Sequence, residues 1–193
     1  MKKTIVRIEI SVLIAVLMVN IFSFIGFSKQ CDEIRNKVLR MHVIANSDED
    51  YDQELKLKVR DAVLEEGREL FDGTLTADDA EEKIVPNIDR LESAALKTII
   101  EEGFDYPVKV TVVNEYFKTR VYENSVTLPA GNYTAVKVVI GEGNGRNWWC
   151  VMFPPMCLPA ANTECELSDV LNTDETDIVT NSEKYKFKFN SAK

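Results

Sequence analysis

The stretch that most constrains the fold runs from Leu128 to Leu158, LPAGNYTAVKVVIGEGNGRNWWCVMFPPMCL. Within it, Tyr133–Ile140 is rich in β-branched residues and bounded by glycines, a pattern typical of a strand. Gly141–Arg146 contains an Asn-Gly pair, which suits the positive φ angles of a tight turn. Asn147–Phe153, with both tryptophans of the chain, then returns as a second strand. The stretch therefore predicts one β-hairpin.

The returning strand is almost continuously apolar, so we expect it to be covered on both faces and to lie inside a sheet. Two prolines end it, because proline cannot donate a backbone hydrogen bond. Cys157 follows Cys150 across this proline turn, and we predict a disulfide between them if the protein is exported. Closing so short a loop would stabilise the fold by about 2–3 kcal/mol. The pairing of Cys31 and Cys165 stays open.

The N-terminal residues resemble a targeting segment. Lys2, Lys3 and Arg7 precede the apolar run Ile10–Phe27. The length of that run lies between a long signal-peptide core and a short membrane helix. We therefore predict that residues 1–28 are a signal peptide or an N-terminal membrane anchor, with cleavage and tethering both open. The positive flank predicts that everything after Lys29 lies on the outer side of the membrane.

Between leader and hairpin, the hydrophobic periodicity predicts helices first and strands afterwards. Val38–Ala45 favours a strand, and apolar residues at helical spacing predict a helix from Asp50 to Phe71. Further helices are predicted up to Val85 and over Asn87–Glu102. The alternating segment Pro107–Val113 indicates a half-buried strand.

This order predicts the α+β class, with a helical half packed on a mainly antiparallel sheet. We expect residues 29–158 to form a single α+β domain, since the chain is long enough for one real core. Residues 159–193 are acidic and rich in Asn and Thr, so we predict a mostly loose C-terminal tail.

Composition and motif content argue against several functions. The net charge of −9 disfavours nucleic acid as a partner. The single histidine, His42, rules out multi-histidine zinc sites, and no phosphate-binding glycine loop is present, so no cofactor is expected. One catalytic alternative remains: an extracytoplasmic thiol hydrolase with Cys150 as nucleophile, His42 as base and Asn46 or Asp48 as the orienting group. The position of Cys150 inside an apolar strand favours an inert sulfur instead.

Two blocks of the sequence resemble a known family. His42–Asp61 (HVIANSDEDYDQELKLKVRD) and Leu128–Leu158, with its PAGNY, GRNWWC and FPPMC pieces, are similar to the stage II sporulation protein R family of endospore-forming Firmicutes. The resemblance covers residues 38–158. It implies a protein exported from the forespore into the intermembrane space. There the protein would activate a membrane-embedded aspartic protease of the mother cell, which cleaves pro-sigma-E. It implies a signalling protein and not an enzyme.

We expect the surface that contacts this protease to combine the two blocks. The candidate residues are their polar and aromatic members: Asn46, Ser47, Asp48, Asp52, Gln53, Arg60, Asp61, Arg146, Asn147, Trp148 and Trp149. A purely structural alternative is equally open. In it, Asn46–Asp48 cap the following helix and Arg60–Asp61 form an internal ion pair.

Overall fold

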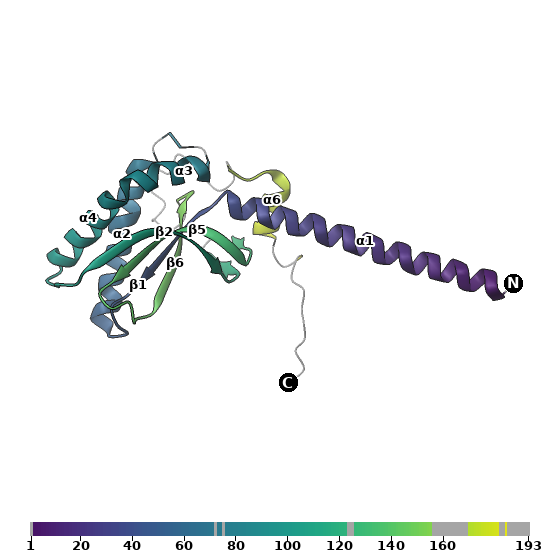
Figure 1. Cartoon of the computed structure of the whole chain (residues 1–193), viewed down its shortest axis with the longest axis horizontal. Coiled ribbons are helices and arrows are strands. Elements are labelled where there is room, and N and C mark those ends of the chain that lie inside the picture. The colour runs from purple at the N-terminus through teal and green to yellow at the C-terminus, as the bar shows by residue number, and fades with distance from the viewer. Residues whose placement is uncertain are drawn as a thin grey trace. The chain divides into compact units, whose positions relative to one another are not determined.

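The computed structural model of the chain describes residues 2–71, 73–74, 76–122, 126–155, 170–181 and 184. It divides the chain into two units, Met1–Glu33 and Ile34–Lys193. The first unit consists of helix α1 (Lys2–Asn36), whose last residues belong to the second unit (purple in Figure 1). The stretch Ile5–Asn36 is long and apolar enough to cross a membrane, a test that a signal sequence also passes.

The second unit has the predicted α+β composition. After α1, its elements are β1 (Leu39–Ile44), α2 (Asp50–Leu70), α3 (Ala77–Ile84), the 3-10 turn η1 (Val85–Asn87), α4 (Ile88–Glu101), β2 (Val108–Phe117), β3 (Arg120–Val121), β4 (Thr127–Leu128), β5 (Gly131–Ile140), β6 (Asn147–Phe153) and α6 (Thr173–Thr180). The helices and the first strands lie where the periodicity predicts them. The hydroxyl of Thr76 caps α3 by accepting from the Asp79 amide at 3.1 Å.

The main sheet has the strand order β2-β5-β1-β6, in which β1 pairs parallel to β5 and antiparallel to β6. The predicted hairpin is therefore wrong, because β1 lies between its two strands. Loop Gly141–Arg146, called the crossing loop below, passes over the end of β1. Six residues can cover the roughly 10 Å between strands that flank a third. The prediction that Asn147–Phe153 lies inside the sheet is also wrong, since β6 is at its edge.

The core lies between the sheet and helices α2, α3 and α4 (Figure 1). Side chains of a strand alternate between faces, so every second residue points to the helices. In β1 these are Leu39, Met41 and Val43, all buried against the helices. Arg40 and His42 consequently point to the other face.

Part of the predicted C-terminal tail is ordered by polar contacts. α6 begins with a capping box between Asn172 and Glu175. Both carboxylate oxygens of the fully buried Glu175 accept hydrogen bonds from Lys37, at 2.7 and 2.8 Å. Residues 170–181 are thus not loose, and most of the remaining tail lies outside the described residues.

Candidate interaction surface

The crossing loop is hydrogen-bonded to the segment that follows β1. The amide of Gly145 donates to the carbonyl of Ala45, and the amide of Asn144 to the carbonyl of Asn46, both at 3.0 Å. The side-chain oxygen of Asn46 accepts from the amide of Glu142, also at 3.0 Å. The two sequence blocks, about a hundred residues apart, therefore meet at one junction.

A charged pair lies at the outer side of this junction. The amide of Arg146 donates to Asp48 Oδ1 at 2.7 Å, and the guanidinium Nε lies 3.6 Å from the same oxygen. Both side chains are about two-thirds exposed, at 67% and 65%. An exposed ion pair contributes about 1 kcal/mol or less, so this one stabilises the junction little and stays accessible to a partner.

Beneath the pair, Asp52 is only 1% exposed. Its Oδ2 accepts from Asn46 Nδ2 at 2.8 Å and from Ser47 Oγ at 2.6 Å. A buried carboxylate must be hydrogen-bonded to be tolerated, and these two bonds fix the direction of the chain between β1 and α2. Asp52 is therefore part of the support of the junction, not of its exposed surface.

Lys56 provides a second buried support and is 4% exposed. Its ammonium donates to Gln53 Oε1 at 2.6 Å and to the carbonyl of Arg146 at 3.0 Å, and Gln53 in turn donates to the carbonyl of Ser47 at 2.8 Å. Burial lowers the pKa of Lys56, and nearby Arg146 lowers it further. The lysine ties the end of the crossing loop to α2.

The capping alternative is wrong for two of its three residues. The N-cap of α2 is Glu49, and it makes no side-chain capping bond. Asn46 and Asp48 accept from backbone amides of the crossing loop, while Ser47 Oγ does accept from the amide of Glu49 at 3.2 Å. Arg60 and Asp61 do form an ion pair, at 2.6 Å, but with Asp61 52% exposed the pair lies at the surface and is not internal.

The two tryptophans point to opposite faces of β6, as neighbours on a strand must. Trp148 is 37% exposed, and the guanidinium carbon of Arg60 lies 4.7 Å from the centre of its ring. Trp149 stacks on His42 at 3.7 Å and meets Phe117 edge-on, on the face away from the helices. Only Trp148 lies on the same side of the sheet as the junction, so the residues of the predicted site are divided between the two faces of the sheet.

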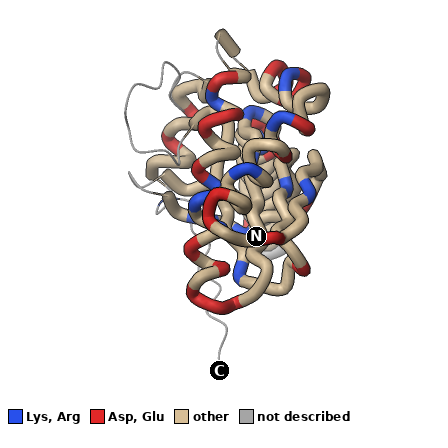
Figure 2. The backbone as a smooth tube through the Cα atoms, turned by 90° about the vertical axis from the view of Figure 1, so that its left-hand side faces the viewer, with Lys and Arg blue, Asp and Glu red and all other residues tan. Residues whose placement is uncertain are grey.

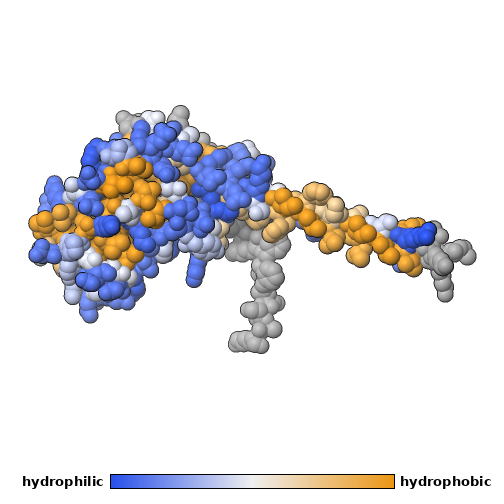
Figure 3. All heavy atoms as spheres, in the orientation of Figure 1, coloured by the Kyte–Doolittle hydropathy of each residue, from blue (hydrophilic) through white to orange (hydrophobic). Residues whose placement is uncertain are grey.

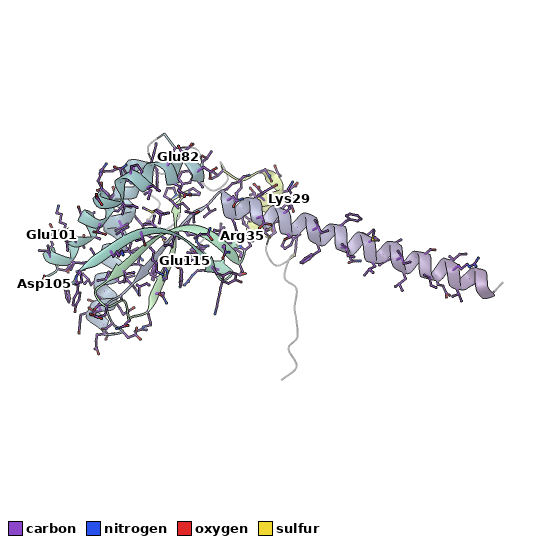
Figure 4. All side chains as sticks on the ribbon, in the orientation of Figure 1. Lys29, Arg35, Glu82, Glu101, Asp105 and Glu115 are labelled. Carbon is purple, nitrogen blue, oxygen red and sulfur yellow. The ribbon has the colours of Figure 1, made fainter. Side chains whose placement is uncertain are left out.

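A polar cluster occupies that other face. His42 Nδ1 lies 2.7 Å from Glu115 Oε1, and His42 Nε2 lies 2.7 Å from Asn147 Oδ1. Glu115, labelled in Figure 4, also accepts from Lys137 at 3.3 Å. Asn147 is exposed and belongs to this cluster, whereas its neighbour Arg146 belongs to the junction.

The register in which β1 pairs with β6 contradicts the thiol hydrolase alternative. Cys150 is paired with Met41 and lies fully buried in the helix-side core, whereas His42 is paired with Trp149 on the opposite face. A sheet thus separates the sulfur from the imidazole, whose two nitrogens face Glu115 and Asn147. Among the described residues, no group of three or more His, Cys, Asp or Glu side chains is arranged to hold a metal ion.

Sequence reasoning missed Lys56, which supports the crossing loop from within. The accessible members of the two blocks form what we call the junction surface: the exposed Asp48, Asp61, Arg146 and Trp148 and the partly buried Arg60. In Figure 2 acidic and basic segments are interspersed over the described part of the chain.

The fold and the site define a class of protein. Its members have an α+β domain after an apolar helix of signal-sequence or anchor type, and in that domain two sequence blocks about a hundred residues apart meet in one junction. Residues 35–163 match the family model described as stage II sporulation protein R. The chain belongs to this family, which supports a role in sporulation. It is 36% identical over 124 residues to stage II sporulation protein R of Bacillus subtilis (strain 168), covering 64% of this chain and 55% of that protein. The chain thus spans about half the length of this relative. No solved structure matches the chain.

Proposed function

We propose that this chain is an exported intercellular signal of endospore formation. It leaves the forespore for the intermembrane space, where it activates a membrane-embedded aspartic protease of the mother cell and so leads to pro-sigma-E cleavage. The observation that carries the proposal is the junction surface, where the two family-like blocks converge. The apolar run at residues 10–27 supports export, with the leader either removed or kept as a tether.

Activation requires the signal to bind the active state of the protease more tightly than the resting state. The junction surface suits such binding because it contains Trp148, Arg60 and Arg146, and Trp and Arg are enriched among the residues that dominate the energetics of protein interfaces. The stack of Arg60 on Trp148 holds two long side chains in place before binding, which lowers the entropy lost on association. The buried Asp52 and Lys56 hold the surface in shape.

Trp148→Ala and Arg146→Glu are each expected to lower pro-sigma-E cleavage by about tenfold or more, since loss of an interface anchor costs 2 kcal/mol or more. The measurement is cleavage in a non-sporulating host that co-expresses this chain, the protease and the sigma precursor. Arg146 is exposed, so Arg146→Glu should change the unfolding midpoint little. Trp148 is 37% exposed and stacks on Arg60, so Trp148→Ala should lower the midpoint as well, and the loss of cleavage should exceed what this loss of stability explains. Matched controls are Val121→Ala and Lys118→Glu, at exposed positions outside the junction surface. Cleavage that falls only as far as stability falls would contradict the proposal.

We further propose that Cys150 pairs with Cys157, which lies outside the described residues. Cys150→Ala and Cys157→Ala should then each lower the free energy of unfolding by about 2–3 kcal/mol. A reductant should weaken the parent chain to the same extent and leave both variants unchanged. A Cys157→Ala variant as stable and as reductant-sensitive as the parent would show that Cys150 pairs elsewhere.

A further inference from the structure

The outer edge of β2 is open within the described part of the chain. β2 pairs with β5 on one side only and ends the sheet. The amide of Val110 donates to Glu92 Oε2 of α4 at 2.9 Å, so the backbone groups of Val110 point away from β5. In an antiparallel ladder alternate residues point the same way, so Val108, Val112, Asn114 and Tyr116 also direct their backbone groups outward. An edge of this kind is a template for another strand.

An apolar stripe lies beside this edge. Leu96 and Ile100 follow Glu92 at four-residue intervals on α4, and their exposed fractions are 41% and 60%. Val85, just before α4, is 50% exposed. Figure 3 shows an apolar area over α4 and beside β2. Apolar surface next to unpaired backbone groups is typical of a protein interface.

We propose that this edge is a homodimer interface, in which β2 pairs antiparallel with β2 of a second copy about a two-fold axis at Val112. The two sheets would then join into one, with the two α4 helices side by side on the same face. Their stripes of Leu96 and Ile100 would cover each other. This proposal does not rest on the proposed signalling function.

The sequence of β2 is complementary to itself in this register. Lys109 lies opposite Glu115 of the second copy, and the two-fold axis makes this charge pair twice. Val108 lies opposite Tyr116, and Thr111 opposite Val113, so β-branched and aromatic residues face each other. Lys109 is exposed and Tyr116 is 63% exposed, so both are accessible for pairing. If the two-fold axis is moved one or two residues along β2 in either direction, neither Lys109 nor Glu115 lies opposite a residue of opposite charge. This charge complementarity favours a second copy over an unrelated strand.

The register also accounts for Glu92 and Asn114. In the single chain, Glu92 accepts a hydrogen bond from the outward amide of Val110. Such a contact protects an edge strand from nonspecific pairing with other strands. In the dimer, the amide of Val110 donates to the carbonyl of Asn114 of the second copy. The exposed side chain of that Asn114 then lies on the face of Glu92 and donates its amide to the released carboxylate. Glu115 accepts from His42 and Lys137 and, with about four lone-pair sites, can also accept from Lys109.

The test is sedimentation of the full chain in a density-matched detergent, alone and with substitutions on β2. The parent chain should be a dimer, and Val112→Pro should be a monomer. Proline at that position removes an outward donor and no bond to β5. Lys109→Glu should weaken dimerisation about tenfold, because two attractive pairs become repulsive. Lys118→Glu makes the same charge change one residue beyond the strand and should leave the dimer intact.

Far-UV circular dichroism and the unfolding midpoint should show that Val112→Pro still folds. A parent chain that is monomeric at high concentration overturns the proposal. A dimer that survives Val112→Pro also overturns it, because contact would then run through another surface such as the apolar helix. If a monomeric parent chain loses cleavage activity on Val112→Pro, the edge instead binds a strand of another protein. A parent chain that is monomeric and fully active in cleavage overturns the dimer and leaves the proposed function standing.

Discussion

Gly145→Ala is expected to destabilise the domain by about 3–4 kcal/mol, because a Cβ atom there meets the backbone of the facing segment. The added carbon would overlap the carbonyl of Ser47 and lie 2.9 Å from the Cβ of Ala45. Backbone atoms cannot rotate aside, so the crossing loop must move away from the end of β1. The bonds from Asn144 and Gly145 would then be lost, at about 1 kcal/mol each.

The measurement is urea unfolding followed by tryptophan fluorescence. Gly73→Ala is the comparison, because Gly73 has no atom within 4 Å of an added Cβ. Its φ of 68° adds a backbone strain of about 1–2 kcal/mol that Gly145, whose φ is not positive, does not have. Cleavage activity should fall with Gly145→Ala as well, since Arg146 follows directly in the displaced loop. Equal losses of stability in the two variants would show that the contact with Ser47 does not hold the junction.

Arg40→Ala is expected to cost about 3–5 kcal/mol. The side chain is fully buried, with its guanidinium carbon 4.3 Å from the ring centre of Phe117 and 4.8 Å from that of Tyr133. Its Nε donates to the carbonyl of Cys150 at 3.1 Å, and Nη2 donates to the hydroxyl of Tyr122. Truncation leaves a cavity among these rings and two acceptors without their donor.

Arg40→Met separates the volume of the side chain from its charge. Burial lowers the pKa of Arg40, and its Nη1 has no hydrogen-bond partner, so the charge itself is poorly accommodated. We expect Arg40→Met to retain most of the stability lost in Arg40→Ala. Arg40→Lys should resemble Arg40→Ala, because a compact ammonium cannot stack between rings and bond in two directions. The measurement is again the free energy of unfolding. A Met variant as weak as the Ala variant would mean that the charge is required.

Local patterns located most of the elements but not the pairing of the strands. Val38–Ala45 and Tyr133–Ile140 each show the composition of a strand, yet nothing within either segment shows that they lie side by side. The Asn-Gly pair of the crossing loop is typical of a hairpin turn, and that local signal led to the wrong pairing. The insertion of β1 follows from burial over the whole sheet, which short-range periodicity does not contain.

The candidate site was also predicted only in part: its segments were located, but not the arrangement of their side chains. The two blocks were identified, but their residues do different work once folded. Asp52 is buried support, Trp148 is exposed, and Trp149 lies on the opposite face of the sheet. Polar residues before a helix are usually read as caps, so the role of Asn46 as acceptor for a loop 96 residues away was not predictable. The capping box that starts α6, Asn172 with Glu175, is a local pattern, but we did not identify it within a segment that is acidic and rich in Asn and Thr.

The central position of β1 has a consequence for the order in which the chain folds. β1 is the first strand to be synthesised, yet both of its neighbours in the sheet come about a hundred residues later. The sheet therefore cannot close until residues up to Phe153 are available, a topology of high contact order that delays folding. A chain that crosses a bilayer with this end first would stay unfolded, and so competent for passage through a narrow translocation channel, until its crossing is nearly complete.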